Sequence, residues 1–544
     1  MPPQLPTWLL GAIMLNGPIL AASAYHWPDY KVEYADHVLF GGSFLPAIAI
    51  NCAERDETTI AAQWVRLAYH DMSTHNVDDG TGGLDASIAY ELDRAENIGS
   101  GMPASINDFV FFTSPANGLA DVIAMGTVIG VAACGGPIIP FRAGRVDASA
   151  AGLPGVPEPQ QDLASHTESF RRQGFTQPEM IGLVACGHTL GGVRREDFPQ
   201  VIHDTSVNLT TFDSTIEFDN RVVAEYLDGT TNNPLVAGPN STTNSDLRIF
   251  SSDGNATMQS IASSEDFRQA CSSLLEKMIN TVPSGVELSD IVEPIEHKVG
   301  DTRLYPNDAG SFTFTTNIRV LSSNPQRKVT LLWSDRQGSV CGTSGCSVDA
   351  TDSRPSSLTY VAKLRGLTSA TQYSFRTSVN MTSSISKFWF QIDEGDGSEA
   401  VVVDNGGSGY EIDQDSVLLD MDRSKRFFRP EDFSNFMNLV VAVHLPVFST
   451  LFKVLMKSSI KVRGDVTSQV SITTYQPASS PTDFLPKRET LQLLPDERFP
   501  TIAGFTFFSA NTTGSPSHLE VQGTVNGQSF KQEFIDAGNI NFAA

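Results

Sequence analysis

Residues 64–71 of this chain read Trp-Val-Arg-Leu-Ala-Tyr-His-Asp, and this stretch decides how the first half folds. Apolar residues recur around it at helical spacing, as at Ile60, Trp64 and Leu67. The four-residue step from Arg66 to His70 places both polar side chains on one face of the helix, so a guanidinium and an imidazole would share one site. Taken alone, the pair is more typical of a surface arginine beside a partly buried histidine.

A second stretch of sequence makes a functional role for Arg66 and His70 the better interpretation. Residues 181–191 read Ile-Gly-Leu-Val-Ala-Cys-Gly-His-Thr-Leu-Gly, a mostly apolar segment in which His188 is the one imidazole. A neutral histidine in apolar surroundings is a natural axial ligand for haem iron. By itself, His188 is equally typical of a histidine whose hydrogen bonds are satisfied within a protein core.

The two stretches together, in this order, resemble the plant, fungal and bacterial haem peroxidase superfamily over roughly residues 45–295. Its distal pattern is Arg-x-x-aromatic-His, and its proximal pattern is Gly-x-His-Thr-Leu-Gly or a close variant. The resemblance implies a haem b cofactor held by His188. It also implies reduction of hydrogen peroxide coupled to one-electron oxidation of small donors such as phenols. His70 would move the peroxide proton as base and then acid, and Arg66 would stabilise the growing negative charge.

Further segments match the family where it would place them. Glu96-Asn-Ile-Gly resembles the segment whose asparagine accepts a hydrogen bond from the distal histidine, which assigns that role to Asn97. Leu247-Arg-Ile-Phe-Ser-Ser-Asp resembles the segment that supplies the proximal carboxylate, which assigns Asp253 as the acceptor of the Nδ1 proton of His188. Arg194 is equally typical of a partner for a haem propionate and of a solvated arginine. A disulfide between Cys52 and Cys134 also follows from the resemblance.

The same comparison predicts two calcium ions, because hard oxygen ligands follow both histidines. Without the neighbouring His70, the distal segment would be read as an ordinary polar loop. The distal site would use the side chains of Asp71, Asp85 and Ser87 and the carbonyl of Gly83. The proximal site would use the side chains of Thr189, Asp213, Thr215 and Asp219 and, with a tighter spacing than the family's, the carbonyl of Glu217.

Several positions depart from specialised members of the family. Tyr69 stands where a phenylalanine or tryptophan is usual, and would either pack as they do or act as an oxidisable side chain. Phe212 stands where cytochrome c peroxidases carry a radical-storing tryptophan. The manganese-binding carboxylates and the surface tryptophan of the fungal lignin-degrading enzymes have no counterparts at the corresponding positions. We therefore expect a generic donor range.

The N-terminal segment, the cysteines and the glycosylation sequons together predict an exported protein. Residues 1–24 lack Asp, Glu, Lys and Arg and pass from an apolar run to a small-residue cleavage pattern, as in a signal peptide. The six cysteines are compatible with an oxidising compartment, and Cys341 and Cys346 flank a short loop that a disulfide would close. Cys186 reads as a buried small hydrophobe, and its pairing with Cys271 is left open. Glycosylation sequons lie at Asn208, Asn240, Asn255, Asn380 and Asn511.

After about residue 300 the sequence changes to short alternating runs rich in β-branched and aromatic residues. We therefore predict a multidomain protein: a signal peptide over 1–24, a mainly α haem peroxidase domain over 25–298, and a β-rich region over 299–544. The β-rich region would form one or two β-sandwiches, separable from the helical domain and without chemistry of its own.

The net charge of the chain limits which classes of macromolecule can be its partners. The chain has 62 acidic and 37 basic residues and a formal charge of -25, which disfavours nucleic acids and anionic membrane surfaces. Besides an active secreted peroxidase, a second hypothesis is an adhesion protein whose β-rich region holds a cell-wall glycan and whose haem domain has little turnover. The intact set of predicted haem-side residues favours the first. A haem sensor would need an output module that the sequence does not reveal.

Overall fold

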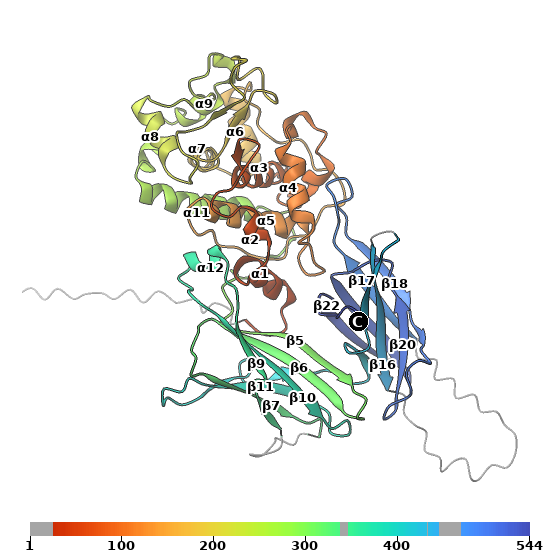
Figure 1. Cartoon of the computed structure of the whole chain (residues 1–544). Coiled ribbons are helices and arrows are strands. Elements are labelled where there is room, and N and C mark those ends of the chain that lie inside the picture. Colours follow the sequence, from red (N-terminus) through yellow and green to blue (C-terminus); the bar gives the residue numbers. More distant parts are fainter. Residues whose placement is uncertain (1–24, 338–345, 432–433, 445–468, 544) are drawn as a thin grey trace, which may run out of the picture.

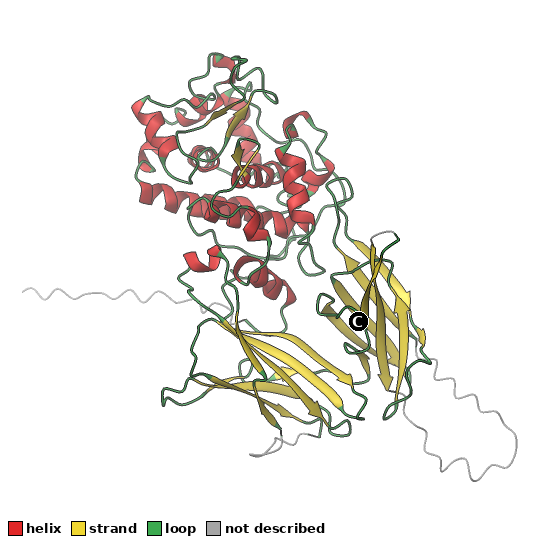
Figure 2. Ribbon diagram, viewed as in Figure 1, coloured by secondary structure: helices red, strands yellow, loops and turns green. Residues whose placement is uncertain are grey.

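The computed structural model of the chain describes residues 25–337, 346–431, 434–444 and 469–543. A helical region comes first and is followed by antiparallel sheets, which confirms the predicted fold class (Figure 2). The first strand of the β-rich region, β5, begins at His297. The predicted signal peptide, 1–24, lies outside the described residues. No described helix combines the length and the apolar character needed to cross a membrane.

The helical region surrounds α5, whose residues from Leu119 to Ala132 are all buried. Gly126 and Gly130 allow close packing on α5, since an added Cβ at Gly126 would lie 2.4 Å from the Phe109 ring and one at Gly130 3.2 Å from Cα of Ala61. The α-helices are α1 Tyr30–Phe40, α2 Leu45–Ile48, α3 Ile60–Met72, α4 Gly101–Val110, α5 Leu119–Ala133, α6 Leu163–Arg172, α7 Gln177–Gly187, α8 Arg221–Asp228, α9 Ser245–Phe250, α10 Ala256–Ser260 and α11 Ser264–Asn280.

Two helices carry the predicted reactive histidines, and their ends are set by local sequence. Thr59 caps α3 by accepting a hydrogen bond from the Ala62 amide. A capping box of Thr176 and Glu179 begins α7, and the helix ends where His188 forms its C-cap. Short elements complete the region: the 3₁₀ turns Ser87–Tyr90, Ala95–Asn97 and Ser241–Thr243, and the strand pairs β1 Glu54–Arg55 with β2 Thr58–Thr59 and β3 Gly192–Arg194 with β4 Leu209–Thr211.

Two disulfides tie the helical region together. Cys52 and Cys134 are bonded, which confirms that prediction. Cys186 is also bonded, to Cys271, and this joins α7 to α11. Cys186 is fully buried as expected, but the expectation that it acts merely as a small hydrophobe is wrong, because its sulfur is part of a cross-link. Cys341 lies outside the described residues, so the small loop closed by Cys341 and Cys346 stays a prediction.

The β-rich region forms two sandwiches. In the first, the strand order β5-β6-β10-β9 faces the order β12-β11-β7-β8, with β13 on β11. These strands are β5 His297–Pro306, β6 Phe312–Val320, β7 Lys328–Ser334, β8 Ser347–Asp349, β9 Asp352–Pro355, β10 Thr371–Val379, β11 Lys387–Asp393, β12 Val401–Val403 and β13 Tyr410–Glu411.

In the second sandwich, the order β14-β16-β20-β19, with β15 on β16, faces β18-β17-β21-β22. Its strands are β14 Val417–Leu419, β15 Lys425–Arg429, β16 Ser434–His444, β17 Val470–Gln476, β18 Lys487–Gln492, β19 Leu494–Pro495, β20 Phe505–Asn511, β21 His518–Val525 and β22 Gln528–Asp536.

The two sandwiches share one sheet as a common wall, and β16 shows this most clearly. Leu439 and Val441 belong to the core of the second sandwich, whereas Val440 and Ala442, which alternate with them, belong to the core of the first. Because successive side chains of a strand point to opposite faces, β16 is covered on both sides.

The β-rich region is joined closely to the helical region. Asp36 on α1 accepts hydrogen bonds from Lys298 at 2.8 Å and Arg319 at 2.9 Å, both on strands of the first sandwich. The short helix α12, Tyr360–Leu364, lies beside α1 between the two regions (Figure 1), and the Tyr360 hydroxyl donates to the carbonyl of Ile129 on α5. The boundary predicted at 298/299 falls inside β5, and the separability of the two parts stays a prediction.

Candidate active site

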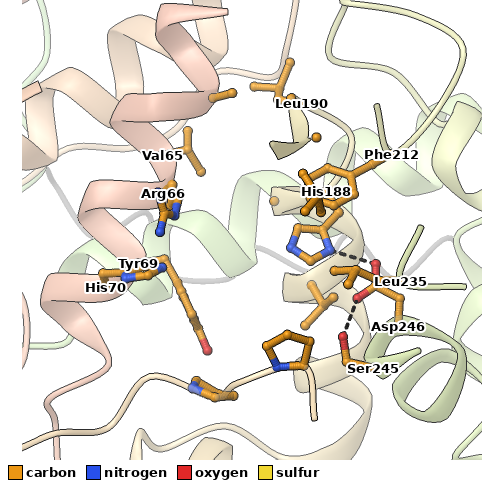
Figure 3. Close-up of a pocket in the computed structure, with 18 of the residues that line it drawn as sticks. Val65, Arg66, Tyr69, His70, His188, Leu190, Phe212, Leu235, Ser245 and Asp246 are labelled. Atoms are coloured by element: carbon orange, nitrogen blue, oxygen red, sulfur yellow. Dashed lines mark hydrogen bonds and ion pairs between the residues drawn. The ribbon is translucent and has the colours of Figure 1, made fainter. Parts of the chain in front are cut away.

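A cavity between α3 and α7 brings the two quoted stretches together (Figure 3). Arg66 and His70 face it from α3, and His188 faces it from the end of α7, across an open gap. The predicted helical face on α3 is therefore present. Most other side chains around the cavity are apolar: Val65, Phe170, Leu183, Leu190, Val193, Phe198, Val201, Phe212, Leu235 and Ile249.

His70 is buried and its tautomer is fixed by its partner. Its Nδ1 lies 2.8 Å from Oδ1 of Asn97, and the Asn97 amide nitrogen donates to the carbonyl of Glu91 at 3.0 Å. The amide oxygen must therefore accept a proton from Nδ1, which leaves Nε2 of His70 with its lone pair free to act as a base. The predicted contact between His70 and Asn97 is present.

Electrostatics keep His70 neutral. Burial, followed by the positive charge of Arg66, lowers the pKa of His70 to about 3, and the hydrogen bond to Asn97 acts in the opposite direction. Burial also lowers the pKa of Arg66 to about 10, against the attraction of the Asp197 carboxylate. The Arg66 guanidinium donates to the carbonyl of Ile98 at 3.0 Å. A neutral base thus lies beside a fixed cation.

His188 is held from its other ring nitrogen. Nδ1 of His188 lies 2.8 Å from Oδ2 of Asp246, and this same oxygen accepts a hydrogen bond from Asn233 at 2.8 Å. The Phe212 ring stacks on the imidazole, with 4.1 Å between centroids and 13° between planes. Since Nδ1 carries the proton toward Asp246, Nε2 is left as a lone pair, and Figure 3 shows it directed into the gap.

The prediction that Asp253 accepts this proton is wrong. Asp253 instead accepts hydrogen bonds from the amide and hydroxyl of Thr257, at 2.9 and 2.6 Å, in the first turn of α10. The motif Leu247–Asp253 does not include Asp246, which lies directly before it. Asn244-Ser-Asp is a helix-start sequence, and it places Asp246 in the first turn of α9 next to the end of α7.

Three further cavity residues bear on the site. The hydroxyl of Tyr69 lies 3.4 Å from Oε1 of Gln173, and its ring stacks on Phe170, so this tyrosine packs as an aromatic residue of the cavity wall. Arg194 lines the cavity, donates to the carbonyl of Asp56, and lies 3.9 Å from Asp197. Asp197 was not predicted, and it is the carboxylate whose charge acts on Arg66.

The residues of the predicted distal calcium site meet behind His70. Asp71 is fully buried and accepts hydrogen bonds from the amides of Ala86 and Ile88, at 2.7 and 2.9 Å. The Ser87 hydroxyl lies 3.4 Å from Asp71, and the Ser87 amide donates to Asp85 at 3.1 Å. Gly83 approaches the same turn, where its amide donates to Thr74.

The residues of the predicted proximal site also meet. The Thr189 hydroxyl donates to the Asp219 carbonyl at 2.6 Å, and the Thr215 hydroxyl lies 3.1 Å from the Asp219 carboxylate. Oδ2 of Asp213 is buried and has no hydrogen-bond partner among the described residues. The Glu217 side chain is exposed. Within the described part of the chain, no group of three or more His, Cys, Asp or Glu residues has metal-binding geometry.

Comparisons with known proteins find sequence matches for part of the chain. The sequence model of the family described as Peroxidase matches residues 49–264. A WSC domain-containing protein of Arthroderma benhamiae is 41% identical over 295 residues, which is 52% of this chain and 41% of that protein. The putative L-ascorbate peroxidase 6 of Arabidopsis thaliana is 38% identical over 142 residues, 24% of this chain and 41% of that protein.

The mitochondrial cytochrome c peroxidase of Yarrowia lipolytica is 29% identical over 148 residues, 26% of this chain and 43% of that protein. The chain thus spans less than half the length of each of these relatives. The residues matched by the family model, 49–264, include Arg66, His70 and His188.

Proposed function

From the match of residues 49–264 to the peroxidase family, we propose that the chain is a haem peroxidase. It would reduce hydrogen peroxide to water while oxidising small donors, phenols in the first place, by one-electron steps. The observation that supports this most directly is the opposition of two histidines across one cavity, each hydrogen-bonded through Nδ1 so that Nε2 is left as a lone pair.

The residues present fit a haem group. The cavity is apolar on most sides, and the His188 imidazole faces it while its Nδ1 is held by a buried carboxylate, Asp246. His188 would hold the iron through Nε2, and the Asp246 carboxylate would make that nitrogen a stronger electron donor. Haem bound there would supply the electrons that break the peroxide O–O bond. Arg194 lines the same cavity and is our candidate for contact with a propionate.

Residues on the α3 side of the cavity would carry out the proton transfer. His70 would take the proton from one peroxide oxygen through Nε2 and return it to the leaving oxygen, as base and then acid. Asn97 keeps the proton of the resting ring on Nδ1, so that Nε2 stays ready. Arg66 would stabilise the negative charge on the leaving oxygen. Two donor molecules together provide the two electrons and two protons that complete the reduction to water.

We also propose two calcium ions beside the haem. One would bind Asp71, Asp85, Ser87 and the Gly83 carbonyl; the other would bind Thr189, Asp213, Thr215, Asp219 and the Glu217 carbonyl. The buried Asp213 oxygen without a partner among the described residues supports the second, because a buried carboxylate oxygen needs a cation or a donor.

Export is part of the proposal, with residues 1–24 removed as a signal peptide. Two disulfides in the described chain are compatible with an oxidising compartment. The β-rich region would add location or stability rather than chemistry, since the residues assigned to peroxide all lie in the helical region.

One spectroscopic experiment tests the central claim. Purified full-length protein should show a Soret band that shifts on addition of hydrogen peroxide and returns when a small phenol is added, with steady turnover of both. If the spectrum of the haem-loaded protein does not change when peroxide is added, the proposal is contradicted. It would favour the adhesion hypothesis, in which the β-rich region holds a cell-wall glycan.

A further inference from the structure

The second sandwich carries a groove where its shared sheet leaves the contact with the first sandwich. Val440 on β16 is buried in that contact, whereas Phe436 and Asn438, on the same face of β16, are only half-buried. Figure 1 shows β16 beside β20 in this sheet. The residues that line the groove and enter the argument are Phe427, Phe436, Asn438, Leu494, Arg498 and Asn511.

One side of the groove is aromatic. Phe427 on β15 and Phe436 on β16 are cross-strand partners, and their rings stack with 5.1 Å between centroids and 14° between planes. The Arg429 guanidinium lies 4.5 Å from the Phe436 centroid. Leu494 adds apolar surface on β19, where it is 71% exposed. Uncovered apolar surface of this kind is stabilised by a ligand that covers it.

The other side is a row of polar side chains that ends at Asn511. Arg498 donates to Oδ1 of Asn438 at 3.0 Å, and Nδ2 of Asn438 donates to Oδ1 of Asn511 at 2.9 Å. Asn438 and Asn511 are direct cross-strand partners. The row therefore fixes the orientation of the Asn511 amide: its oxygen is turned toward Asn438, and its nitrogen is turned away from it.

Nδ2 of asparagine is the atom that receives an N-linked sugar, and Asn511-Thr-Thr is a sequon. Asn511 is exposed, and its amide oxygen already has a donor. The sequons at Asn208 and Asn380 are also exposed, but neither residue lines this groove. Asn511 thus combines a sequon, a fixed amide and an adjacent aromatic wall.

We propose that Asn511 carries an N-linked glycan whose first sugars lie in this groove, against Phe436 and Phe427. Diagonal neighbours on a sheet lie roughly 7–8 Å apart, so a sugar attached at Asn511 reaches Phe436, which lies diagonally from it. A pyranose ring has apolar C–H faces that pack on aromatic side chains and hydroxyls that pair with groups such as the Arg498 guanidinium. The groove offers both.

The covalent step is the ordinary transfer of the secretory pathway. Nδ2 of Asn511 loses a proton and forms a bond to C1 of the first sugar, while the bond from C1 to the diphosphate of a lipid-linked oligosaccharide breaks. The inference rests on the proposed export of the chain and is independent of the proposed peroxidase activity.

The test uses full-length protein secreted from a eukaryotic host, with peptide mapping of each sequon and thermal unfolding. We expect Asn511 to be occupied. Trimming the glycan to its first sugar should leave Tm nearly unchanged. Thr513→Ala removes the sequon and keeps Asn511. It should lower Tm by about 2–4 °C, the shift expected when a domain of this size loses about 1 kcal/mol of stability. Asn208→Gln is the matched control, at an exposed sequon away from the groove, and should leave Tm unchanged.

A double-mutant comparison tests the contact itself. Phe436→Leu should lower Tm more in the glycosylated protein than in the Thr513→Ala background, because the sugar packs on the ring. Phe427→Leu provides the same comparison should the first variant fold poorly. Equal losses in both backgrounds would overturn the proposal.

Other outcomes are equally decisive. An unmodified Asn511, whether beside occupied Asn208 or Asn380 or in a secreted chain without sugar at any sequon, would overturn this inference and leave export standing. Retention of the chain inside the host cell with residues 1–24 still attached would refute export itself. If insoluble β-glucan or chitin retains the Thr513→Ala protein and does not retain its Phe436→Leu derivative, the groove belongs to an external polysaccharide and the proposed occupant is wrong.

Discussion

Oδ2 of Asp246 lies 2.8 Å from Nδ1 of His188. The same oxygen accepts a hydrogen bond from the Asn233 amide, also at 2.8 Å. Asp246 is buried, whereas the His188 side chain keeps 31% of its surface exposed on the cavity side of the pair. A fixed carboxylate therefore holds a ring whose other nitrogen is available. The first prediction follows from this pair.

Asp246→Asn should leave haem bound but slow peroxide cleavage about 10- to 100-fold, because loss of a carboxylate behind a ligating histidine makes the ligand a weaker electron donor. The iron reduction potential should rise for the same reason. Asp253→Asn is the matched control, since the Asp253 carboxylate is bonded to the Thr257 amide in the first turn of α10, and its rate should stay within a few-fold of the wild type. Stopped-flow kinetics would measure both, and equal effects would contradict the assignment.

His70→Ala should retain haem and slow peroxide cleavage by roughly 10²-fold or more, the range expected when a general acid-base group is lost. The exposed His203 provides a control, and His203→Ala should react at the wild-type rate. Conversely, His188→Ala should lose the haem or its normal absorption spectrum. A resting enzyme in which His70 is bound directly to iron would reverse both roles.

Dialysed, active protein should contain about two tightly bound calcium ions per chain. Asp213→Asn should remove the proximal ion and Asp71→Asn the distal one, since each substitution replaces a buried charged oxygen ligand by a neutral amide. Elemental analysis counts the ions. Active wild-type protein free of calcium after dialysis would refute both sites, and wild-type calcium content in both variants would refute the ligand assignment.

Asp36→Asn should lower the free energy of unfolding by about 3–5 kcal/mol, because it leaves the buried Arg319 and the largely buried Lys298 without their counter-charge. Asp483→Asn, which removes an exposed pair with Lys487, should have little effect. Denaturant unfolding compares the two variants. Similar losses in the free energy of unfolding would show that the Asp36 contact contributes no more to stability than an exposed ion pair.

The same contact predicts a pH dependence. Burial raises the pKa of Asp36, but Lys298 and Arg319 outweigh it, so the pKa lies below its ordinary value. The contribution is therefore fully present above the unfolded pKa of about 3.9 and is lost as pH falls below it. The difference in stability between wild type and Asp36→Asn should accordingly shrink below pH ~4.

A chain cut after residue 298 should unfold at a lower temperature than the full chain, because the cut removes Arg319 and the contact of Tyr360 with Ile129. The folded, haem-loaded fraction should still turn over peroxide with a small phenol. Activity normalised to haem content separates the two effects. A folded truncation without turnover would show that the β-rich region contributes to the active site.

Part of the site could be predicted from short-range sequence patterns. The Arg66 to His70 step lies within one helix, where a four-residue spacing fixes a shared face. The change from helix to strand near residue 300 was predicted from the same kind of local pattern. The contact of His70 with Asn97 and the Cys52–Cys134 bond join distant residues and were predicted only from the family resemblance.

The partner of His188 was decided by tertiary structure. Asp246 directly precedes the motif Leu247–Asp253, and Asp253 ends it. The packing of α9 against α7 selects which of the two carboxylates reaches the imidazole. The same holds for the Cys186–Cys271 bond, for Asp36 among Lys298 and Arg319, and for the groove at Asn511. Sequence determined which segments become helices and strands and which residues can do chemistry, because periodicity and side-chain type are local. Only the folded chain decided which distant residues meet, because that depends on how whole elements pack.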